Sequence, residues 1–317
     1  MLENQILKKS RLVLLAQSDG CCVYQMKNGT GDGTMTVYDI FPGVMLAYND
    51  YHMENCFSEF QTEEDLLCID HCREGRLEYP AKDAAYSYVE SGDLKIDRRL
   101  KHTGRFSFPL SHYHGITVSF QLSEAARALP EEFRGFPVDL YEIQRKFCAG
   151  NSPMVLHGAP SIDHIFDELY AVPEKIKRAY FKIKVLELLL YLDALELPKN
   201  REERPYFYKS QVEKIKSIRA LMAEHPERHY TMAELSARFN IPLTPMKSCF
   251  KSVYGSPIGT YMRVFRMNRA AVLLRQERGT GIAEIAGRIG YDSPSKFAAA
   301  FKEVIGKTPL EYRRNPR

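Results

Sequence analysis

The chain has 317 residues, of which 44% are hydrophobic and 26% are charged, so we expect two domains with a hydrophobic core in each. No apolar run approaches the roughly 18 residues that a membrane helix needs, and the start of the chain has too short an apolar stretch for a secretory signal. We therefore expect a cytoplasmic protein with no membrane partner. The seven cysteines form no Cys-x-x-Cys pair, which favours reduced thiols over a disulfide framework.

Charge is distributed unevenly along the chain. Residues 211–317 contain 19 Lys and Arg against 9 Asp and Glu, a net charge of +10, whereas the remainder carries −6. Between Leu235 and Gln276 there is no acidic residue, although seven basic residues fall within that stretch. Because a solvated surface usually mixes both signs, a basic stretch of this length indicates a polyanionic partner.

Residues 20 to about 121 have the pattern of a β-rich domain. Short runs of β-branched and aromatic residues are separated by turn signals such as Asn28–Gly33. The clearest runs are 35–40, 66–69, 86–89 and 115–120. Many short strands at this spacing favour a barrel or a sandwich, so we assign residues 1–121 to one β-rich domain.

Helical patterns begin after Leu122 and continue to a polar linker at residues 201–209. Ser161 is expected to cap a helix over residues 161–170, and Pro173 begins a strong helix that runs to the Pro198 stop. The broad apolar stripe of this helix fits either a partner subunit or the flank of the β domain. We predict dimerisation through residues 122–200. The stripe consists of Ile176, Tyr180, Ile183, Leu186, Leu190 and Leu197, and Leu189 and Leu192 widen it.

Residues 210–317 contain a first pair of short helices. Thr231 and Glu234 form a capping box before a helix over residues 232–239, and Asn240–Pro242 ends that helix. Thr244 is expected to cap the next helix, with Pro245 in its first turn. Burying Met246, Cys249, Phe250 and Val253 leaves four polar or basic residues on the opposite face: Thr244, Lys247, Ser248 and Lys251.

A second pair repeats this plan. The short helix 282–289 is followed by Ser293 as a cap and Pro294 as the first residue of a helix that ends at Gly306. Its inner face has Phe297, Ala300, Phe301, Val304 and Ile305, and Ser295, Ala299 and Lys302 stand opposite, with Lys296 at the edge. The helix 258–275 between the pairs spans roughly 27 Å, which suits two recognition helices about 34 Å apart on DNA.

Both pairs are similar to the signature of AraC/XylS-type transcription regulators. The resemblance covers residues 211–315 and rests on Ile282-Ala283-Glu284-Ile285-Ala286, Gly290-Tyr291, Ser293-Pro294-Ser295-Lys296-Phe297, Phe301-Lys302, Gly306, Thr308-Pro309-Leu310-Glu311-Tyr312-Arg313, Leu235, Phe250-Lys251, Gly255-Ser256-Pro257 and Arg266-Met267-Asn268-Arg269-Ala270. It implies a multidomain protein in which a cupin-like β-barrel with following helices precedes an all-α domain, residues 210–317, with two helix-turn-helix units.

The resemblance also implies an effector-responsive activator that binds double-stranded DNA, forms a homodimer through residues 173–197 and contacts RNA polymerase. Recognition helices at 244–254 and 294–305 would enter successive major grooves. Base contacts are expected from Thr244, Lys247, Ser248, Ser295, Lys296 and Ala299, whose methyl can touch a thymine methyl. Phosphate contacts are expected from Lys251, Arg263, Arg266, Arg269, Lys302 and Arg313.

Several of these positions also have a structural interpretation. Any one lysine or arginine can be an ordinary solvated charge. Arg266 can be internal to the packing of the linker helix, and Thr244 and Ser295 can serve as helix caps.

Candidate effector and metal positions lie in the first domain. The stretch 105–115 resembles regulators that sense siderophores, which implies a bulky aromatic or iron-chelating effector near Phe106, Phe108, His112 and His114. His112 and His114 are similar to the His-x-His of metal-binding cupins, but no Glu follows at the usual distance. Cys68 and Cys72 have no second ligand pair nearby and are interpreted as core thiols. We expect no metal and no cofactor.

Two other functional classes remain as alternatives. A cupin-type metal-dependent enzyme with a basic helical tail requires three converging ligands, and the histidines available for it are scattered: His52, His71, His102, His112 and His114. A protein-binding module is disfavoured by the basic stretch. We therefore expect no enzymatic activity.

Overall fold

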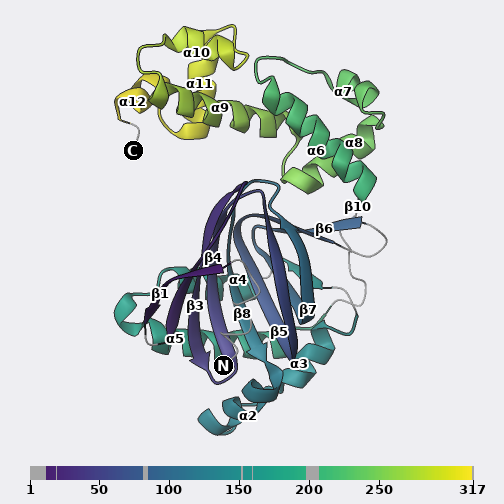
Figure 1. Cartoon of the computed structure of the whole chain (residues 1–317), viewed down its shortest axis with the longest axis vertical. Coiled ribbons are helices and arrows are strands. Elements are labelled where there is room, and N and C mark those ends of the chain that lie inside the picture. The colour runs from purple at the N-terminus through teal and green to yellow at the C-terminus, as the bar shows by residue number, and fades with distance from the viewer. Residues whose placement is uncertain are drawn as a thin grey trace. The chain divides into compact units, whose positions relative to one another are not determined.

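A computed structural model of the chain describes residues 12–18, 20–80, 85–150, 153–158, 160–197 and 207–315. The chain divides into two compact units, Met1–Tyr206 and Phe207–Arg317 (Figure 1). Of the predicted linker 201–209, residues 201–206 lie outside the described residues. No described helix combines the length and the apolar character that crossing a bilayer requires.

The first unit is built on one curled sheet. Strands β1 to β4, β8, β5 and β6 follow one another across it, and β7 pairs with both β5 and β9 (Figure 1). The strands are β1(Leu12–Ser18), β2(Cys21–Asn28), β3(Gly31–Phe41), β4(Val44–His52), β5(Asn55–Pro80), β6(Ala85–Glu90), β7(Asp93–Ser107), β8(Tyr113–Gln121) and β9(Met154–His157). The mainly β first region is confirmed, as a half-barrel.

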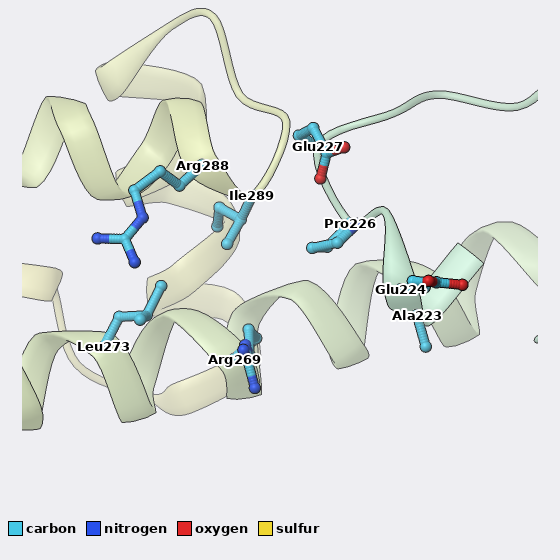
Figure 2. A pocket seen from close by; sticks show the side chains of 8 residues that line it. All are labelled: Ala223, Glu224, Pro226, Glu227, Arg269, Leu273, Arg288 and Ile289. Atoms are coloured by element: carbon cyan, nitrogen blue, oxygen red, sulfur yellow. The ribbon is translucent and has the colours of Figure 1, made fainter. Parts of the chain in front are cut away.

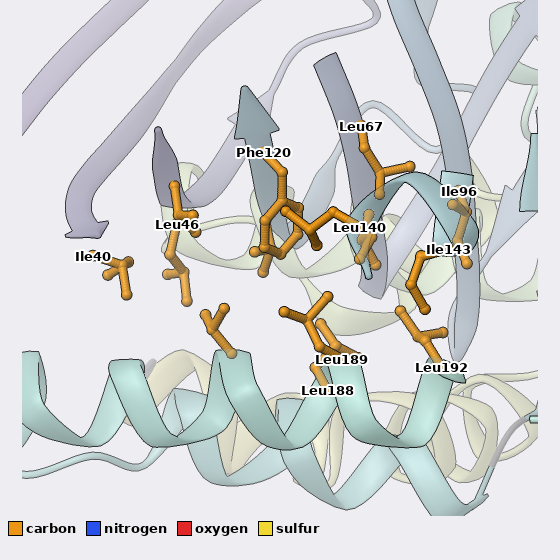
Figure 3. Packing of buried hydrophobic residues seen from close by; sticks show 14 of the residues in the cluster. Ile40, Leu46, Leu67, Ile96, Phe120, Leu140, Ile143, Leu188, Leu189 and Leu192 are labelled. Carbon is orange, nitrogen blue, oxygen red and sulfur yellow. The ribbon is translucent and has the colours of Figure 1, made fainter. Parts of the chain in front are cut away.

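Helices cover one face of this sheet (Figure 1). They are α2(Leu122–Glu132), α3(Leu140–Phe147), α4(Pro160–Tyr170), the short 3-10 helix η1(Glu174–Ile176) and α5(Lys177–Ala194). Because side chains alternate between the faces of a strand, Ile116, Val118 and Phe120 of β8 all point toward the helices. Leu188, Leu189 and Leu192 of α5 pack against this face (Figure 3). Helices and strands therefore share one hydrophobic core.

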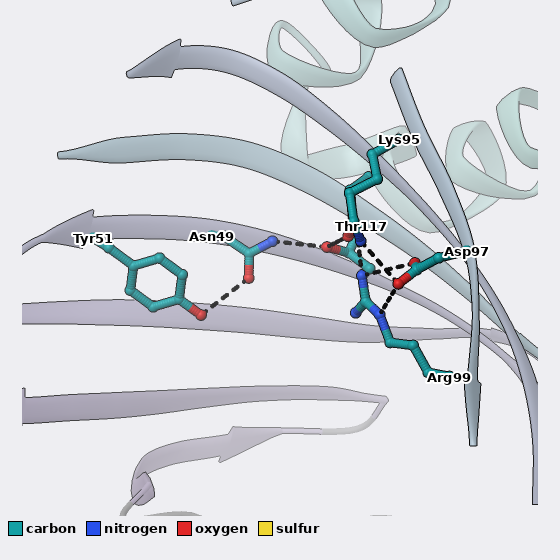
Figure 4. Close-up of polar contacts among 7 residues, drawn as sticks. Asn49, Tyr51, Lys95, Asp97, Arg99 and Thr117 are labelled. Atoms are coloured by element: carbon teal, nitrogen blue, oxygen red, sulfur yellow. Dashed lines mark hydrogen bonds and ion pairs between the residues drawn. The ribbon is translucent and has the colours of Figure 1, made fainter. Parts of the chain in front are cut away.

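The other face of the sheet contains a buried ionic network (Figure 4). Lys95 Nζ lies 3.1 Å from Asp70 Oδ2 and 2.9 Å from Asp97 Oδ2, and Arg99 pairs with both carboxylates. Thr117 Oγ1 donates to Asp70 Oδ1 at 2.7 Å. Burial raises the pKa of Asp97, but the charges of Arg99 and Lys95 outweigh this effect and hold that pKa below its usual range.

A polar chain and an aromatic cluster extend this network. Asn49 donates to Thr117 Oγ1 at 2.9 Å, and the Tyr51 hydroxyl donates to Asn49 at 3.2 Å. The Tyr51 ring stacks on Phe108, which in turn stacks on Tyr113, with centroid separations of 5.5 and 5.6 Å. The inner face of the half-barrel is therefore partly ionic and partly aromatic.

The second unit is helical apart from a two-residue strand. It comprises β10(Phe207–Tyr208), α6(Lys209–Glu224), α7(Met232–Arg238), α8(Leu243–Tyr254), α9(Ile258–Gln276), α10(Ile282–Arg288), α11(Pro294–Ile305) and α12(Pro309–Arg314). Two short helix pairs, α7–α8 and α10–α11, are connected by the long helix α9 (Figure 1). The prediction of an all-α region with two helix-turn-helix units is confirmed.

Three details of the first unit differ from the sequence prediction. Helix α4 begins at Pro160, one residue before the predicted cap Ser161. The helix predicted from Pro173 is a 3-10 turn followed by α5, which begins at Lys177. Strands β1 and β9 and helix α3 were not predicted, because β1 is mostly exposed, β9 has only four residues and α3 only eight.

Only part of the apolar stripe predicted for the helix from Pro173 faces the sheet, because Leu186 and Leu197 pack against the shared core and other members are exposed. The buried residues of α5 are Phe181, Lys184, Val185, Leu188, Leu189 and Leu192. Ile176, Ile183 and Leu190, three members of the predicted stripe, are 47%, 59% and 43% exposed. Helix α5 therefore carries a second apolar face in addition to the one that covers the sheet.

Candidate DNA interface

The first helix pair is fixed by a capping box and a turn with positive φ. Thr231 accepts a hydrogen bond from the backbone of Glu234, and the Glu234 carboxylate accepts from the backbone of Thr231 at 2.7 Å. Asn240, at φ 45°, reverses the chain between α7 and α8. Helix α8 begins at Leu243 with Pro242 as its N-cap residue and no side-chain cap. The prediction that Thr244 caps this helix was wrong.

The outer face of α8 is exposed and carries no carboxylate. Its inner face consists of Met246, Cys249, Phe250, Val253 and Tyr254, all buried. The residues on the opposite face, all exposed, are Thr244, Lys247, Ser248 and Lys251. Because Thr244 is not the cap, its hydroxyl belongs to this outer face.

The second helix pair follows its predicted boundaries closely. Ser293 accepts a hydrogen bond from the backbone of Lys296, Pro294 occupies the first turn, and α11 ends at Gly306 with φ 83°. Phe297, Ala300 and Phe301 are buried. The four residues expected on the outer face are exposed: Ser295, Lys296, Ala299 and Lys302.

One acidic residue distinguishes the second outer face from the first. Glu303 of α11 forms an ion pair with Arg263 of α9. Glu303 is more exposed than Arg263, at 66% against 40% of the side chain. The charge of Arg263 is thus partly neutralised beside α11, whereas Lys251 lies in a stretch without acidic residues.

Arg266 has a structural position in the described residues. Its guanidinium donates from Nε to the Pro226 carbonyl at 2.7 Å and from Nη2 to the Arg228 carbonyl at 3.0 Å. Burial lowers its pKa, which the nearby Tyr291 and Glu227 only partly offset. These contacts tie the α6–α7 loop to α9, so they support the structural interpretation of Arg266 over a phosphate contact.

The same loop also holds the second helix pair. The His229 Nε2 lies 2.6 Å from the Gly290 carbonyl oxygen. Gly290 has φ 86°, and a Cβ atom built on it would lie 2.7 Å from the Glu227 carbonyl oxygen. Only glycine fits this close approach without strain. The loop 225–230 therefore connects both helix pairs.

A cavity of about 230 Å³ lies where α6, α9 and α10 meet (Figure 2). Arg269, a predicted phosphate contact, is exposed and lines this cavity. The lining residues are Ala223, Glu224, Pro226, Glu227, Arg269, Leu273, Arg288 and Ile289.

Arg313, another predicted phosphate contact, is turned inward. Its Nε and Nη2 atoms are buried and make no hydrogen bond within the described residues.

The predicted effector residues do not form one site. Phe108 is buried in the aromatic cluster with Tyr51 and Tyr113, and the half-buried Phe106 packs against the same cluster. His112 and His114 are also half-buried, but His114 Nε2 lies 2.6 Å from Asp50 Oδ1. Since residues 114 and 113 alternate on β8, His114 faces away from the aromatic cluster.

Cys68 and Cys72 occupy core positions. Both are buried, and burial raises the pKa of each thiol to about 12. The seven cysteines are all free. A buried thiol that stays protonated is a poor metal ligand, because metals bind the thiolate. These positions therefore fit the interpretation of core thiols.

Residues 235–315 match the family model described as a helix-turn-helix domain. The F1 operon positive regulatory protein of Yersinia pestis is 51% identical over 67 residues, which cover 21% of this chain and 22% of that protein. A putative AraC-like transcription regulator of Streptomyces lividans is 34% identical over 91 residues, covering 29% of this chain and 30% of that protein.

Among solved structures, ToxT from Vibrio cholerae covers 85% of this chain and 98% of its own, at 11% identity and a TM-score of 0.27. The chain matches less than a third of the length of the two curated relatives. The similarity to them is thus confined to part of the chain, and the family match lies wholly in the second unit. Residues 235–315 are a helix-turn-helix domain, and the matched part of the chain is similar to a putative AraC-like regulator.

Proposed function

We propose that this protein is a sequence-specific, DNA-binding transcription regulator whose helices α8 and α11 enter successive major grooves. The observation that carries the proposal is the pair of exposed outer faces on these two helices. Each face presents hydroxyl and ammonium groups, and each helix is held by a buried inner face. The matched family and the named relatives give no support to the enzyme alternative.

In this proposal the two faces contribute differently to recognition. Lys247 of α8 stands at the centre of a face without carboxylates, where it can donate to guanine O6 and N7. Thr244 and Ser248 supply hydroxyl groups beside it. On α11, Ser295 and Lys296 supply polar groups, and Ala299 offers only a methyl. We therefore assign most base discrimination to α8.

Phosphate contacts are assigned to basic residues at or beside the two outer faces. Lys251 and Lys302 end these faces and are exposed, as is Arg269 of α9. Arg263 of α9 is half-buried and paired with Glu303, so it can contact a phosphate only when that ion pair opens. Neutralising phosphates releases counterions, so the logarithm of the binding constant should fall with slope about −0.9 per contact as salt rises. Arg266 and Arg313 are left out because their side chains are turned into the unit.

Two alanine variants test this division of roles. Lys247→Ala should weaken binding to the target site by about 1–3 kcal/mol and weaken binding to random DNA less. Lys302→Ala should weaken binding to the target site and to random DNA alike. It should also reduce the magnitude of the salt slope by about 0.9, the contribution of one phosphate contact. Binding is measured by fluorescence anisotropy at several salt concentrations, with a target site obtained by selection from random duplexes.

The matched control is Lys27→Ala, because Lys27 is an exposed lysine of β2 in the other unit. It should leave both affinities unchanged. An equal loss on target and random DNA for Lys247→Ala would show that Lys247 contacts phosphate and does not read bases. Selection that enriched no sequence would contradict specific binding.

We also propose that α5 forms a homodimer interface. Ile183 and Leu190 lie seven residues apart on its exposed side, the repeat of a helix that packs along a partner helix, and Ile176 at the end of η1 is exposed seven residues earlier. Ile183→Glu should shift the protein toward monomer in sedimentation velocity. Tyr141→Glu, which changes an exposed aromatic residue of α3, should not. A dimer that survived Ile183→Glu would place the interface elsewhere.

The proposed mode of action is activation in response to a small effector. The relative from Yersinia pestis is named as a positive regulatory protein, which supports activation. Contact with RNA polymerase is part of this proposal. For the effector we propose the inner face of the half-barrel, where the aromatic cluster adjoins the ionic network. Phe106 and Phe108 belong to that region, and His114 does not. Native mass spectrometry of the full chain, as purified, should detect a copurifying small molecule.

A further inference from the structure

Three side chains of the first unit converge where β4 ends and β8 begins. Asp50 Oδ1 lies 2.9 Å from His52 Nε2 and 2.6 Å from His114 Nε2. One candidate ligand atom from each residue lies within 4.8 Å of the other two. Two imidazoles and one carboxylate thus meet at a single point on the sheet.

The sheet itself brings these residues together. Asp50 and His52 are two residues apart on β4 and therefore point to the same face. Asp50 lies directly opposite His114 in the pairing of β4 with β8, which are adjacent strands (Figure 1). Directly opposed residues have Cβ atoms roughly 4.5–5.5 Å apart, so the backbone sets the spacing of the cluster.

The ligand types and spacing suit a divalent transition metal ion. Such ions take imidazole nitrogen and carboxylate oxygen at about 2.0–2.2 Å. Four tetrahedral ligands at such lengths would lie about 3.4 Å from one another, which is longer than the 2.6 and 2.9 Å between Asp50 and the two imidazoles and within the 4.8 Å that bounds the cluster. We propose that Asp50, His52 and His114 bind a divalent transition metal ion, with zinc as the ion of first choice.

Exposure determines what kind of site this would be. The side chains of His52, Asp50 and His114 are 62%, 51% and 32% exposed, so water can complete the coordination shell. An ion at this point would link β4 to β8 at the end of their pairing. We assign the cluster metal binding alone, because its side chains stand partly exposed at the ends of two strands.

His112 provides a natural control within the same region. Its ring centroid is 6.3 Å from that of His114, and its Nδ1 lies 3.3 Å from the Leu110 carbonyl oxygen. The His112–His114 pair of the sequence is therefore not the proposed ligand set. His114 belongs to the site and His112 lies outside it.

Zinc titration of the full, tag-free and metal-stripped protein tests the proposal. Isothermal calorimetry should give one zinc ion per chain for the wild type and for His112→Ala. His52→Ala and His114→Ala should each weaken affinity by about tenfold or more. Asp50→Asn, which keeps the side-chain shape, should do the same. Zinc should also raise the Tm of the wild type, and should raise that of His52→Ala by less at the same zinc concentration.

Three outcomes would overturn the proposal. The first is a wild type that binds no zinc at micromolar concentration. The second is equal affinity in the wild type and in His52→Ala, His114→Ala and Asp50→Asn, since the ion would then bind elsewhere. The third is a cobalt complex whose spectrum shows thiolate-to-metal charge transfer, which would indicate a cysteine site. The proposal is independent of DNA binding, because the cluster and Lys247 lie in different units.

Discussion

The two units of this protein use the same charged residue types in opposite ways. In the first unit Lys95, Asp70 and Asp97 lie on the inner face of a sheet and are nearly inaccessible to solvent. In the second unit Lys247 and Lys251 stand on an exposed helix face, within a stretch that has no acidic residue. Burial and pairing distinguish the two arrangements.

This difference predicts how each unit responds to solution conditions. A buried ion pair is screened little by salt but depends on the protonation state of its members. The binding of an exposed cation to a polyanion weakens strongly as the salt concentration rises. Changes in pH should therefore act mainly on the stability of the first unit, and changes in ionic strength on DNA binding by the second.

The largest expected effect is loss of a buried cation. Lys95→Met removes the partner of two buried carboxylates and leaves Arg99 as their remaining cation, so the first unit should lose about 3–5 kcal/mol of stability. Hydrogen–deuterium exchange at β5 and β7 in the full chain measures this loss. Lys27→Met, at an exposed position of β2, should change stability by less than about 0.5 kcal/mol. Similar losses in both variants would mean that the network contributes no special stability.

Acid should destabilise the first unit through His71. Its ring is stacked on Phe166 at a centroid distance of 4.2 Å, and burial lowers its pKa to about 4. The unfolded chain, with a histidine pKa near 6.5, binds a proton that the folded unit does not bind. Stability is thus fully present above about pH 6.5 and falls by about 3 kcal/mol toward pH 4.

The variant His71→Phe keeps the stack and removes this titration. Between pH 7 and pH 4 its first unit should lose markedly less stability than that of the wild type, measured by exchange at β5. Asp97, whose pKa is held low, should contribute a further loss only below about pH 4, where the unfolded carboxyl takes up a proton. Identical pH profiles for the two proteins would contradict the role of His71.

In the second unit, a backbone contact should matter more to stability than any surface charge. Gly290→Ala places a Cβ within 2.7 Å of the Glu227 carbonyl oxygen at a positive φ, which should cost about 1–3 kcal/mol. Exchange at α10 and α11 measures the change. Gly287→Ala is the matched control, because a Cβ there meets no atom within 4 Å and alanine favours the helix by about 0.5–1 kcal/mol. Equal effects would show that the loop 225–230 does not restrain Gly290.

Local signals explain why the helical unit was predicted well from the sequence. The start of α11 at Ser293 and Pro294 and its end at Gly306 depend on caps only a few residues away. The same reasoning failed at α8, where Thr244 resembled a cap although the helix begins one residue earlier. The outer face of α8 was nevertheless predicted, because it depends on helical periodicity and tolerates a small shift of the boundary.

The features that were not predicted from the sequence depend on contacts between residues far apart in the chain. Asp70 and Lys95 meet across two strands 25 residues apart, and their alternation along each strand resembles an ordinary solvent face. Asp50 and His114 are opposed only through the pairing of β4 with β8. Likewise, helical periodicity predicted an apolar stripe on α5, but periodicity alone does not determine which face of the helix packs against the sheet. Such contacts need the register of the strands and the docking of the helix.

The smallest expected effect concerns the acidic residue beside α11. Glu303→Gln removes the negative partner of Arg263 and keeps the size of the side chain at position 303. The guanidinium of Arg263 on α9 is then free beside the proposed DNA-binding face. Because exposed ion pairs contribute about 0.2–1 kcal/mol, unfolding should change little. Affinity for DNA should rise modestly, and the salt slope should steepen by about 0.9 if Arg263 gains a phosphate. Fluorescence anisotropy across a salt series measures both quantities.

The double variant Glu303→Gln with Arg263→Gln separates the two explanations for such a gain. If Arg263 is the freed contact, the double variant should lose the gain and return to a slope close to that of the wild type. If the gain persists without Arg263, it comes from removing the negative charge of Glu303 itself, which would otherwise repel the phosphates. Either result locates the charge that makes the outer face of α11 weaker than that of α8, and an unchanged affinity in Glu303→Gln would remove Glu303 from the comparison.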